Sequence, residues 1–245
     1  MSHVALPIPV LITRPQPQAG RLADEISVEM GDMARPIVST LMQTMDLYSA
    51  LPEGPFDGVI LTSEAGAAAA GRLVKKAITL PKRAYCVGVR TAEVACSHGF
   101  DATADGATAA ELMQVLTRGR TPGRLLYLHG RDVSVQLDHL LIRAGIPAAA
   151  AVIYAQDPHP LTEEAIAVLS RSGPVIVPLY SARSARLFMA ALTPEMHAQI
   201  HPCVIAKPAL LALSEPLLAR AVVADHPDGA AMLASIRRAI RALLP

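Results

Sequence analysis

The amino-acid sequence predicts an α/β protein of two similar lobes, each built on a parallel sheet flanked by helices. Short runs of aliphatic and β-branched residues recur along the chain. A turn and a helical pattern follow each run, which is typical of βα units. The order of these units in the second half of the chain repeats that of the first half. A length of 245 residues is also enough for two domains of ordinary size.

The first series of units occupies the first half of the chain. Its expected strand and helix pairs are Val10–Pro15 with Ala19–Val28, Gly58–Ser63 with Glu64–Lys75, and Tyr85–Gly88 with Thr91–His98. Gly99 ends the third helix, as glycine commonly does. Near the end of the series, Thr108 and Glu111 have the spacing of a capping box and predict the start of a closing helix.

The second series repeats this plan. Its expected pairs are Arg124–Gly130 with Val135–Ala144, Val175–Ser181 with Ala182–Leu192, and Cys203–Ala206 with a further helix. Pro227–Leu233 opens the last helix, as Gly106–Leu112 does in the first series. A period of about 120 residues lies far above the 20–50 residues of solenoid repeats, so it predicts duplicated lobes. The alternative is chance similarity between Ala-rich segments.

Composition argues against nucleic acid and membranes as partners. The formal net charge is +1 and no run of Lys or Arg occurs, so the basic footprint of a nucleic-acid-binding protein is missing. No apolar stretch reaches the ~18 residues expected of a membrane span. Met1–Val10 lacks the basic region and long apolar core of a secretory signal. We therefore expect a cytoplasmic protein, and a monomer.

Cysteine and histidine spacing predicts no metal site. Cys86, Cys96 and Cys203 are too scattered for a C-x-x-C pair or a zinc site, and we expect them to be small buried hydrophobic residues. The eight His residues are equally dispersed, and none belongs to an H-E-x-x-H motif. No metal ion is expected.

Small polar residues, Gly or Arg stand where several strands lead into helices. These strand ends are Thr13–Arg14, Thr62–Ser63, Gly88–Thr91, Gly130–Arg131 and Ser181–Ser184. Free N–H groups at helix N-termini with a hydroxyl beside them bind anions, and ligands of open α/β sheets lie at the carboxyl ends of the strands. Each residue alone is also explained as an ordinary N-cap. Together, the set predicts a cleft for a polyanionic ligand.

Common catalytic motifs are absent from the sequence. It contains no G-x-S-x-G elbow, no phosphate-binding loop and no G-x-G-x-x-G fingerprint after the first strand, which disfavours a nucleotide-binding protein. His129 and His159 are candidate general acids, although a lone His near a turn is more often a surface or packing residue. An enzyme of this kind would work by holding a reactive substrate in shape.

Six motifs, taken in order, resemble the uroporphyrinogen-III synthase family over nearly the whole chain. They are I-T-R-P at Ile12–Pro15, D-G-V-I-L-T-S at Asp57–Ser63, V-G-x-x-T-A at Val87–Ala92, L-L-Y-L-H-G-R at Leu125–Arg131, V-I-Y at Val152–Tyr154 and S-x-R-S-A at Ser181–Ala185. Each motif is weak by itself. Their order and spacing identify the family.

The resemblance implies an enzyme of haem and tetrapyrrole synthesis, a lyase that needs no metal or organic cofactor. Such an enzyme cyclises the linear tetrapyrrole hydroxymethylbilane with loss of water and inverts the last pyrrole ring through a spiro intermediate. The substrate carries carboxylates on every ring, which suits a cleft of N–H groups, hydroxyls and arginines. The preceding enzyme, hydroxymethylbilane synthase, is the protein partner that this activity suggests.

The resemblance also implies roles for individual residues. The family's tyrosine that assists departure of the hydroxyl falls on Tyr154, whose alternative role is packing at a strand end. The substrate-binding residues would be Arg14, Thr62, Ser63, Gly88, Thr91, Arg131, Ser181, Arg183 and Lys207. Ile205–Ala209 departs from the family pattern: a hydroxyl is lost, and Lys207 would serve as the anion partner instead.

The departure at Ile205–Ala209 keeps a second reading open. In that reading the chain is a non-catalytic two-lobed module that binds an anion or a tetrapyrrole, derived from a synthase that lost activity. The family further implies a swapped layout. Residues 1–37 with 157–245 would form one domain and residues 40–153 the other, with extended linkers at 36–41 and 151–157.

Overall fold

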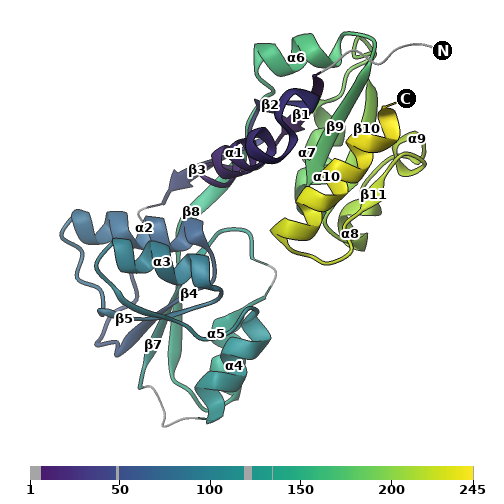
Figure 1. The fold of residues 1–245 in the computed structure, drawn as a ribbon. Coiled ribbons are helices and arrows are strands. Elements are labelled where there is room, and N and C mark those ends of the chain that lie inside the picture. Colours follow the sequence, from purple (N-terminus) through teal and green to yellow (C-terminus); the bar gives the residue numbers. More distant parts are fainter. Residues whose placement is uncertain (1–6, 48–49, 119–122, 134, 245) are drawn as a thin grey trace. The chain divides into compact units, whose positions relative to one another are not determined.

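The computed structural model describes residues 7–47, 50–118, 123–133 and 135–244. The chain divides into two compact units, each with its own sheet and helices (Figure 1). The first unit joins Met1–Gln43 to Pro158–Pro245, and the second unit is Thr44–Asp157. Every described strand pairing for which a register is known is parallel. The predicted α/β class, with parallel sheets flanked by helices, is confirmed.

The sheet of the first unit has the order β11-β10-β9-β1-β2. Its strands are β1 (Ile8–Ile12), β2 (Ala34–Val38), β9 (Pro174–Leu179), β10 (Gln199–Val204) and β11 (Val222–Val223). One face packs on α1 (Gln18–Met30) and α10 (Gly229–Leu243). The other face packs on α6 (Glu163–Leu169), α7 (Ala182–Ala191), α8 (Lys207–Leu210) and α9 (Glu215–Leu218). A short 3₁₀ turn, Gly31–Met33, leads from α1 into β2.

The sheet of the second unit has the order β3-β8-β7-β4-β5-β6. Its strands are β3 (Met42–Asp46), β4 (Gly58–Leu61), β5 (Arg83–Cys86), β6 (Asp101–Ala104), β7 (Leu125–Gly130) and β8 (Ala148–Pro158). One face packs on α2 (Glu64–Lys75) and α3 (Val89–Ser97). The other face packs on α4 (Ala109–Arg118) and α5 (Leu137–Arg143). Every residue of β4 and β7 is buried, because helices cover both faces of these central strands.

The segments expected to link the lobes are strands in the structure. Residues 36–38 belong to β2, and residues 151–157 belong to β8. β8 pairs with β7 and lies next to β3 in the sheet of the second unit. The exact domain boundaries remain a prediction.

Helix caps follow the sequence pattern with one difference. The Oγ1 of Thr108 accepts the N–H of Glu111, as a capping box requires. The carboxylate of Glu111 accepts the N–H of Ala107, at 2.8 Å, and not that of Thr108. A complete box forms instead at α7, where Ser181 and Ser184 each accept the backbone N–H of the other.

The prediction that all three cysteines are buried holds for two of them. Cys86 and Cys203 are buried, and burial raises the pKa of each thiol to about 12. Cys96 is exposed, so the prediction is wrong there. The reason is its position on α3: Ala92 and Ala95 face the sheet, while the residue after Ala95 points to solvent.

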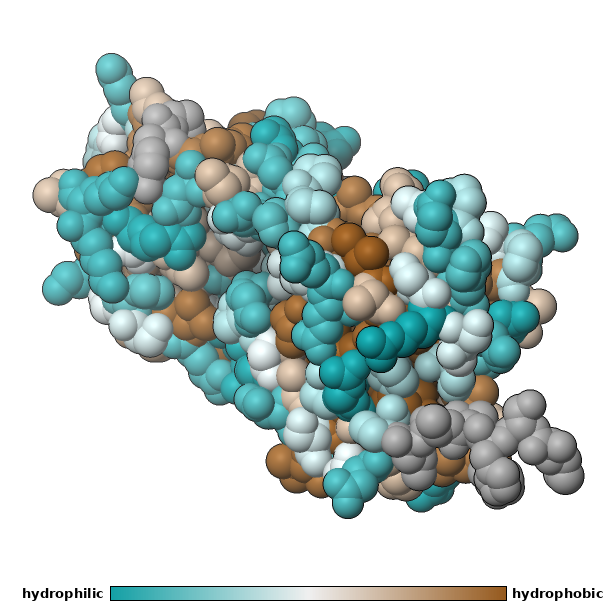
Figure 2. Space-filling model, turned by 90° about the horizontal axis from the view of Figure 1, so that it is seen from above, coloured by the Kyte–Doolittle hydropathy of each residue, from teal (hydrophilic) through white to brown (hydrophobic). Residues whose placement is uncertain are grey.

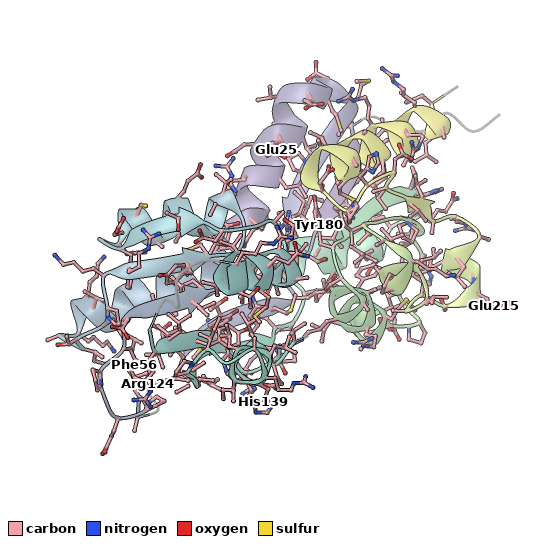
Figure 3. All side chains as sticks on the ribbon, turned by 90° about the horizontal axis from the view of Figure 1, so that it is seen from below. Glu25, Phe56, Arg124, His139, Tyr180 and Glu215 are labelled. Atoms are coloured by element: carbon pink, nitrogen blue, oxygen red, sulfur yellow. The ribbon has the colours of Figure 1, made fainter. Side chains whose placement is uncertain are left out.

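Hydrophilic residues cover most of the face drawn in Figure 2, with apolar residues showing between them. Inside the second unit, Arg124, just before β7, contacts Phe56 in the loop that precedes β4. Its guanidinium carbon lies 4.4 Å from the ring centroid of Phe56, a contact that can be followed in Figure 3. No helix among the described residues is long and apolar enough to span a membrane.

Replacing Ala77 with Gly is expected to stabilise the protein. Ala77 follows the end of α2 with a φ of 63°, in the left-handed region where a side chain costs about 1–2 kcal/mol. We expect the free energy of unfolding to rise by about 1 kcal/mol, measured by urea denaturation. The control is Ala234→Gly, an exposed position inside α10, where the same change should cost about 1 kcal/mol. Equal effects of the two variants would contradict the prediction.

Candidate functional site

The candidate site lies at the carboxyl ends of β4 and β7 in the second unit. β4 ends at Leu61 and leads through Thr62 and Ser63 into α2. Ser63 is the N-cap of that helix, and its Oγ accepts the N–H of Gly66 at 3.0 Å. The strand end therefore fixes two adjacent hydroxyls at the helix N-terminus.

Each of these hydroxyls meets a phenol. The Oγ of Ser63 lies 3.0 Å from the Oη of Tyr154, which β8 supplies. The Oγ1 of Thr62 lies 3.4 Å from the Oη of Tyr127, which β7 supplies. The site thus contains two hydroxyl pairs from three neighbouring strands.

Gly130 makes room for the ring of Tyr154. The register between β7 and β8 shifts between His129 and Gly130, and this shift brings Gly130 opposite Tyr154. A Cβ on Gly130 would lie 2.6 Å from Cζ and 2.9 Å from Oη of that tyrosine. The carbonyl of Tyr154 also accepts the N–H of Arg131 at 2.9 Å. The position of the phenol therefore depends on a residue without a side chain.

A cavity of about 290 Å³ opens over the two hydroxyl pairs. Its described lining comprises Thr62, Ser63, Val87, Ala109, Tyr127, Gly130, Asp132, Val133, Val135, Leu137 and Tyr154. Asp132 is the only charged side chain among these residues. The cavity therefore combines apolar walls, four hydroxyls and one carboxylate.

Burial controls the acidity of both phenols. Burial raises the pKa of Tyr154 above its ordinary value of 10.0, the hydrogen bond with Ser63 opposes the rise, and Asp132 adds to it. Burial likewise raises the pKa of Tyr127. Both phenols are therefore protonated at neutral and moderately alkaline pH and can donate a hydrogen bond.

Three other predicted residues of the second unit lie outside the cavity lining. Gly88 is the N-cap of α3 with a φ of 80°, and its N–H donates a hydrogen bond to the carbonyl oxygen of Gly106. Thr91 is buried in α3, and Arg131 forms an ion pair with Asp157. The structure thus brings Thr62, Ser63 and Tyr154 together, and it places Gly88, Thr91 and Arg131 beyond them.

The remaining predicted residues belong to the first unit. Arg14, Ser181 with Arg183, and Lys207 follow the carboxyl ends of β1, β9 and β10, which are neighbouring strands. The guanidinium carbon of Arg14 lies 3.7 Å from the ring centroid of Tyr180, which Figure 3 labels. The Oγ1 of Thr13, beside Arg14, is fully buried without a hydrogen-bond partner among the described residues. The carboxyl ends of these three strands thus carry cationic side chains and hydroxyls.

A second cavity, of about 300 Å³, lies at the opposite edge of the sheet in the second unit. Its lining is mainly apolar and includes Ile78, Leu80 and Phe100, near the amino ends of β5 and β6. Catalytic ligands of parallel sheets bind at the carboxyl ends of the strands. The cavity with Tyr154 is therefore the candidate site.

Two residues of the site were not singled out from the sequence. Tyr127 stands between Leu126 and Leu128 in a fully buried strand and stacks on His129, with ring centroids 4.6 Å apart. A polar phenol in such a strand is the signal that could have found it, because a buried hydroxyl needs a partner. Asp132 stands two residues after the end of β7 at Gly130, and its residue type alone gives no comparable signal.

No group of three or more His, Cys, Asp or Glu residues within the described ranges is arranged to hold a metal ion. His129 is buried, and its Nδ1 lies 2.7 Å from the carbonyl oxygen of Gly130. This backbone contact occupies one ring nitrogen of a residue considered as a general acid. The chemistry of the cavity itself rests on its hydroxyls and on Asp132.

Comparison with known proteins agrees with this fold. A family model described as uroporphyrinogen-III synthase HemD matches residues 29–234. A crystal structure of uroporphyrinogen-III synthetase from Helicobacter pylori is 19% identical, with a TM-score of 0.63, and the match covers 94% of this chain and 99% of that one.

A mutant uroporphyrinogen III synthase from Thermus thermophilus is 14% identical, with a TM-score of 0.52, covering 96% and 99% of the two chains. The search of curated proteins gave no match. None of these comparisons favours the non-catalytic alternative. Because the family model matches most of its length, the chain belongs to the uroporphyrinogen-III synthases, cyclising lyases of tetrapyrrole biosynthesis.

Proposed function

We propose that the chain cyclises hydroxymethylbilane, with loss of water and inversion of the terminal pyrrole ring, and that the hydroxyl departs in the cavity of the second unit. Family membership supports the reaction. The observation that carries the location is the 3.0 Å contact between Ser63 and Tyr154 inside that cavity. It holds a protonated phenol in a fixed position.

Tyr154 is the proposed hydrogen-bond donor to the leaving hydroxyl. The pyrrole nitrogen pushes electrons toward the hydroxymethyl carbon, the C–O bond breaks, and the phenol proton converts the departing hydroxide to water. A positioned acid typically contributes 10²–10⁴-fold. Ser63 orients the phenol, and its own geometry is fixed by the cap that it forms on α2.

The carboxylates of the substrate are proposed to bind at the strand ends of both units. Gly88, Thr91 and Arg131 would serve in the second unit, and Arg14, Ser181, Arg183 and Lys207 in the first, while Thr62 and Ser63 would contact the substrate inside the cavity. Exposed Lys207 begins α8, whose N-cap Ala206 offers no side-chain hydroxyl. This placement supports Lys207 as the anion partner where the family pattern is altered.

The product isomer tests this function. Hydroxymethylbilane cyclises slowly without enzyme to the I isomer, so the assay generates it in place with hydroxymethylbilane synthase. With the purified chain added, we expect the III isomer to dominate. A reaction without the chain is the control. If the I isomer alone forms, at the rate of that control, the proposed function is wrong.

Three further points belong to the same proposal. Hydroxymethylbilane synthase is the partner that supplies the substrate, and the cytoplasm is where both proteins work. The two units act as the swapped domains, residues 1–37 with 157–245 and residues 40–153, joined at 36–41 and 151–157. The discontinuous composition of the first unit supports this layout.

A further inference from the structure

The charge of the cavity restricts which part of the substrate it can hold. Asp132 is the only charged side chain among its described lining residues, and none of those residues is basic. A carboxylate arm placed there would meet the like charge of Asp132, with no cationic side chain in the described lining to offset the repulsion. The cavity is therefore better matched to a neutral or cationic group than to an acetate or propionate.

A pyrrole ring that loses its hydroxyl is such a group. When the C–O bond of the hydroxymethyl group breaks, the nitrogen lone pair moves into the ring, and positive charge spreads over the nitrogen and the exocyclic carbon. We propose that the cavity receives this reacting ring, and that the Asp132 carboxylate stabilises the positive charge that develops on it. This inference rests on the proposed function.

The fold places the carboxylate and the phenol at the same end of the sheet. Asp132 stands two residues after Gly130, the residue against which the Tyr154 ring packs. The backbone N–H of Arg131, between them, donates to the carbonyl of Tyr154. The neighbouring strands β7 and β8 thus bring the proposed acid and the proposed counter-charge to one cavity.

The charges and protons of the step balance. The phenol of Tyr154 gives its proton to the departing hydroxide, which leaves as water, and a phenolate and a cationic ring remain beside the carboxylate. The substituted carbon of the terminal ring then attacks the cationic carbon and forms the spiro intermediate. The bond from that substituted carbon to its methylene bridge breaks and re-forms at the free position of the inverted ring, and the proton lost from that position returns to the phenolate. The Asp132 charge favours the cation but also opposes ionisation of Tyr154, whose pKa it raises, and the adjacent cation offsets that opposition by favouring the phenolate.

Substitution of Asp132 tests this role. We expect Asp132→Asn to lower kcat by about tenfold with KM unchanged. The reduction is modest because Asp132 is exposed, so water weakens the interaction between its charge and the cationic ring. Asp132→Glu keeps the charge and should restore most of the rate. The matched control is Asp101→Asn, an exposed carboxylate paired with Arg83 at the amino end of β6, which should leave both constants unchanged.

The outcomes separate this inference from the proposed function. Absence of the III isomer with the wild-type chain refutes the function itself. With an active wild type, an unchanged kcat in Asp132→Asn overturns only the role of Asp132. A lower KM in that variant also overturns it, because it means that a carboxylate arm occupies the cavity. A kcat that falls equally in the Asn and Glu variants contradicts a role based on charge.

Discussion

Replacing Gly130 with Ala is expected to abolish most of the activity and to destabilise the protein. The new Cβ would lie 2.6 Å from Cζ of Tyr154, well inside normal contact. Either the tyrosine ring or the end of β7 must move, and overpacking of this kind typically costs about 1–3 kcal/mol. A displacement of about 1 Å of a catalytic group costs on the order of 100-fold in rate.

The activity and the free energy of unfolding of Gly130→Ala are measured together. The control is Gly229→Ala, where an added Cβ meets no atom within 4 Å at the start of α10, and it should leave both quantities close to wild type. In the double variant with Tyr154→Phe, activity should fall little below that of Gly130→Ala alone. Full additivity would mean that Gly130 acts independently of Tyr154.

Replacing Tyr154 with Phe is expected to lower kcat by about 100-fold, within the range of a lost general acid. The ring remains to fill the space beside Gly130, so the change removes only the hydroxyl that contacts Ser63. Loss of this hydrogen bond should cost about 1 kcal/mol of stability. The control is Tyr85→Phe, on β5 and outside the described cavity lining, which should keep wild-type activity. A Tyr154→Phe enzyme as fast as wild type would refute the role of the phenol.

The pH dependence provides a second readout for Tyr154. Because burial raises its pKa above 10.0, the wild-type kcat should not fall through loss of this proton until the pH exceeds about 10. A raised folded-state pKa means that the stabilising contribution is complete below the unfolded pKa and is lost as pH rises through the folded value. Above about pH 10, stability should therefore fall less steeply in Tyr154→Phe than in wild type. Equal slopes in urea titrations would contradict this expectation.

Much of the site could be predicted because strand ends are local features. Aliphatic runs such as Gly58–Leu61 and Leu125–Gly130 predict buried parallel strands, and the polar residues that follow them mark the carboxyl edge. Thr62 and Ser63 were found in this way. The capping role of Ser63 also follows from residue type and position alone.

The charge of the cavity could not be predicted by the same reasoning. Thr62 and Ser63 were expected to face carboxylates directly, whereas their hydroxyls lie against Tyr127 and Tyr154 in a cavity lined by Asp132. Sequence patterns assign a residue to a strand end without showing which side chains share a space. Arg14 is a similar case, since its contact with Tyr180 joins residues that are far apart in the chain.

The sequence by itself determined the α/β class, the order of the strands along the chain and the polar character of their carboxyl ends. These properties depend on periodicity and on caps, which are encoded within a few residues. Only the tertiary structure decided that Tyr154 meets Ser63, 91 positions away, and that Gly130 must lack a side chain. The physical reason is the register of β7 against β8, with its shift at Gly130, because a register is a relation between two strands.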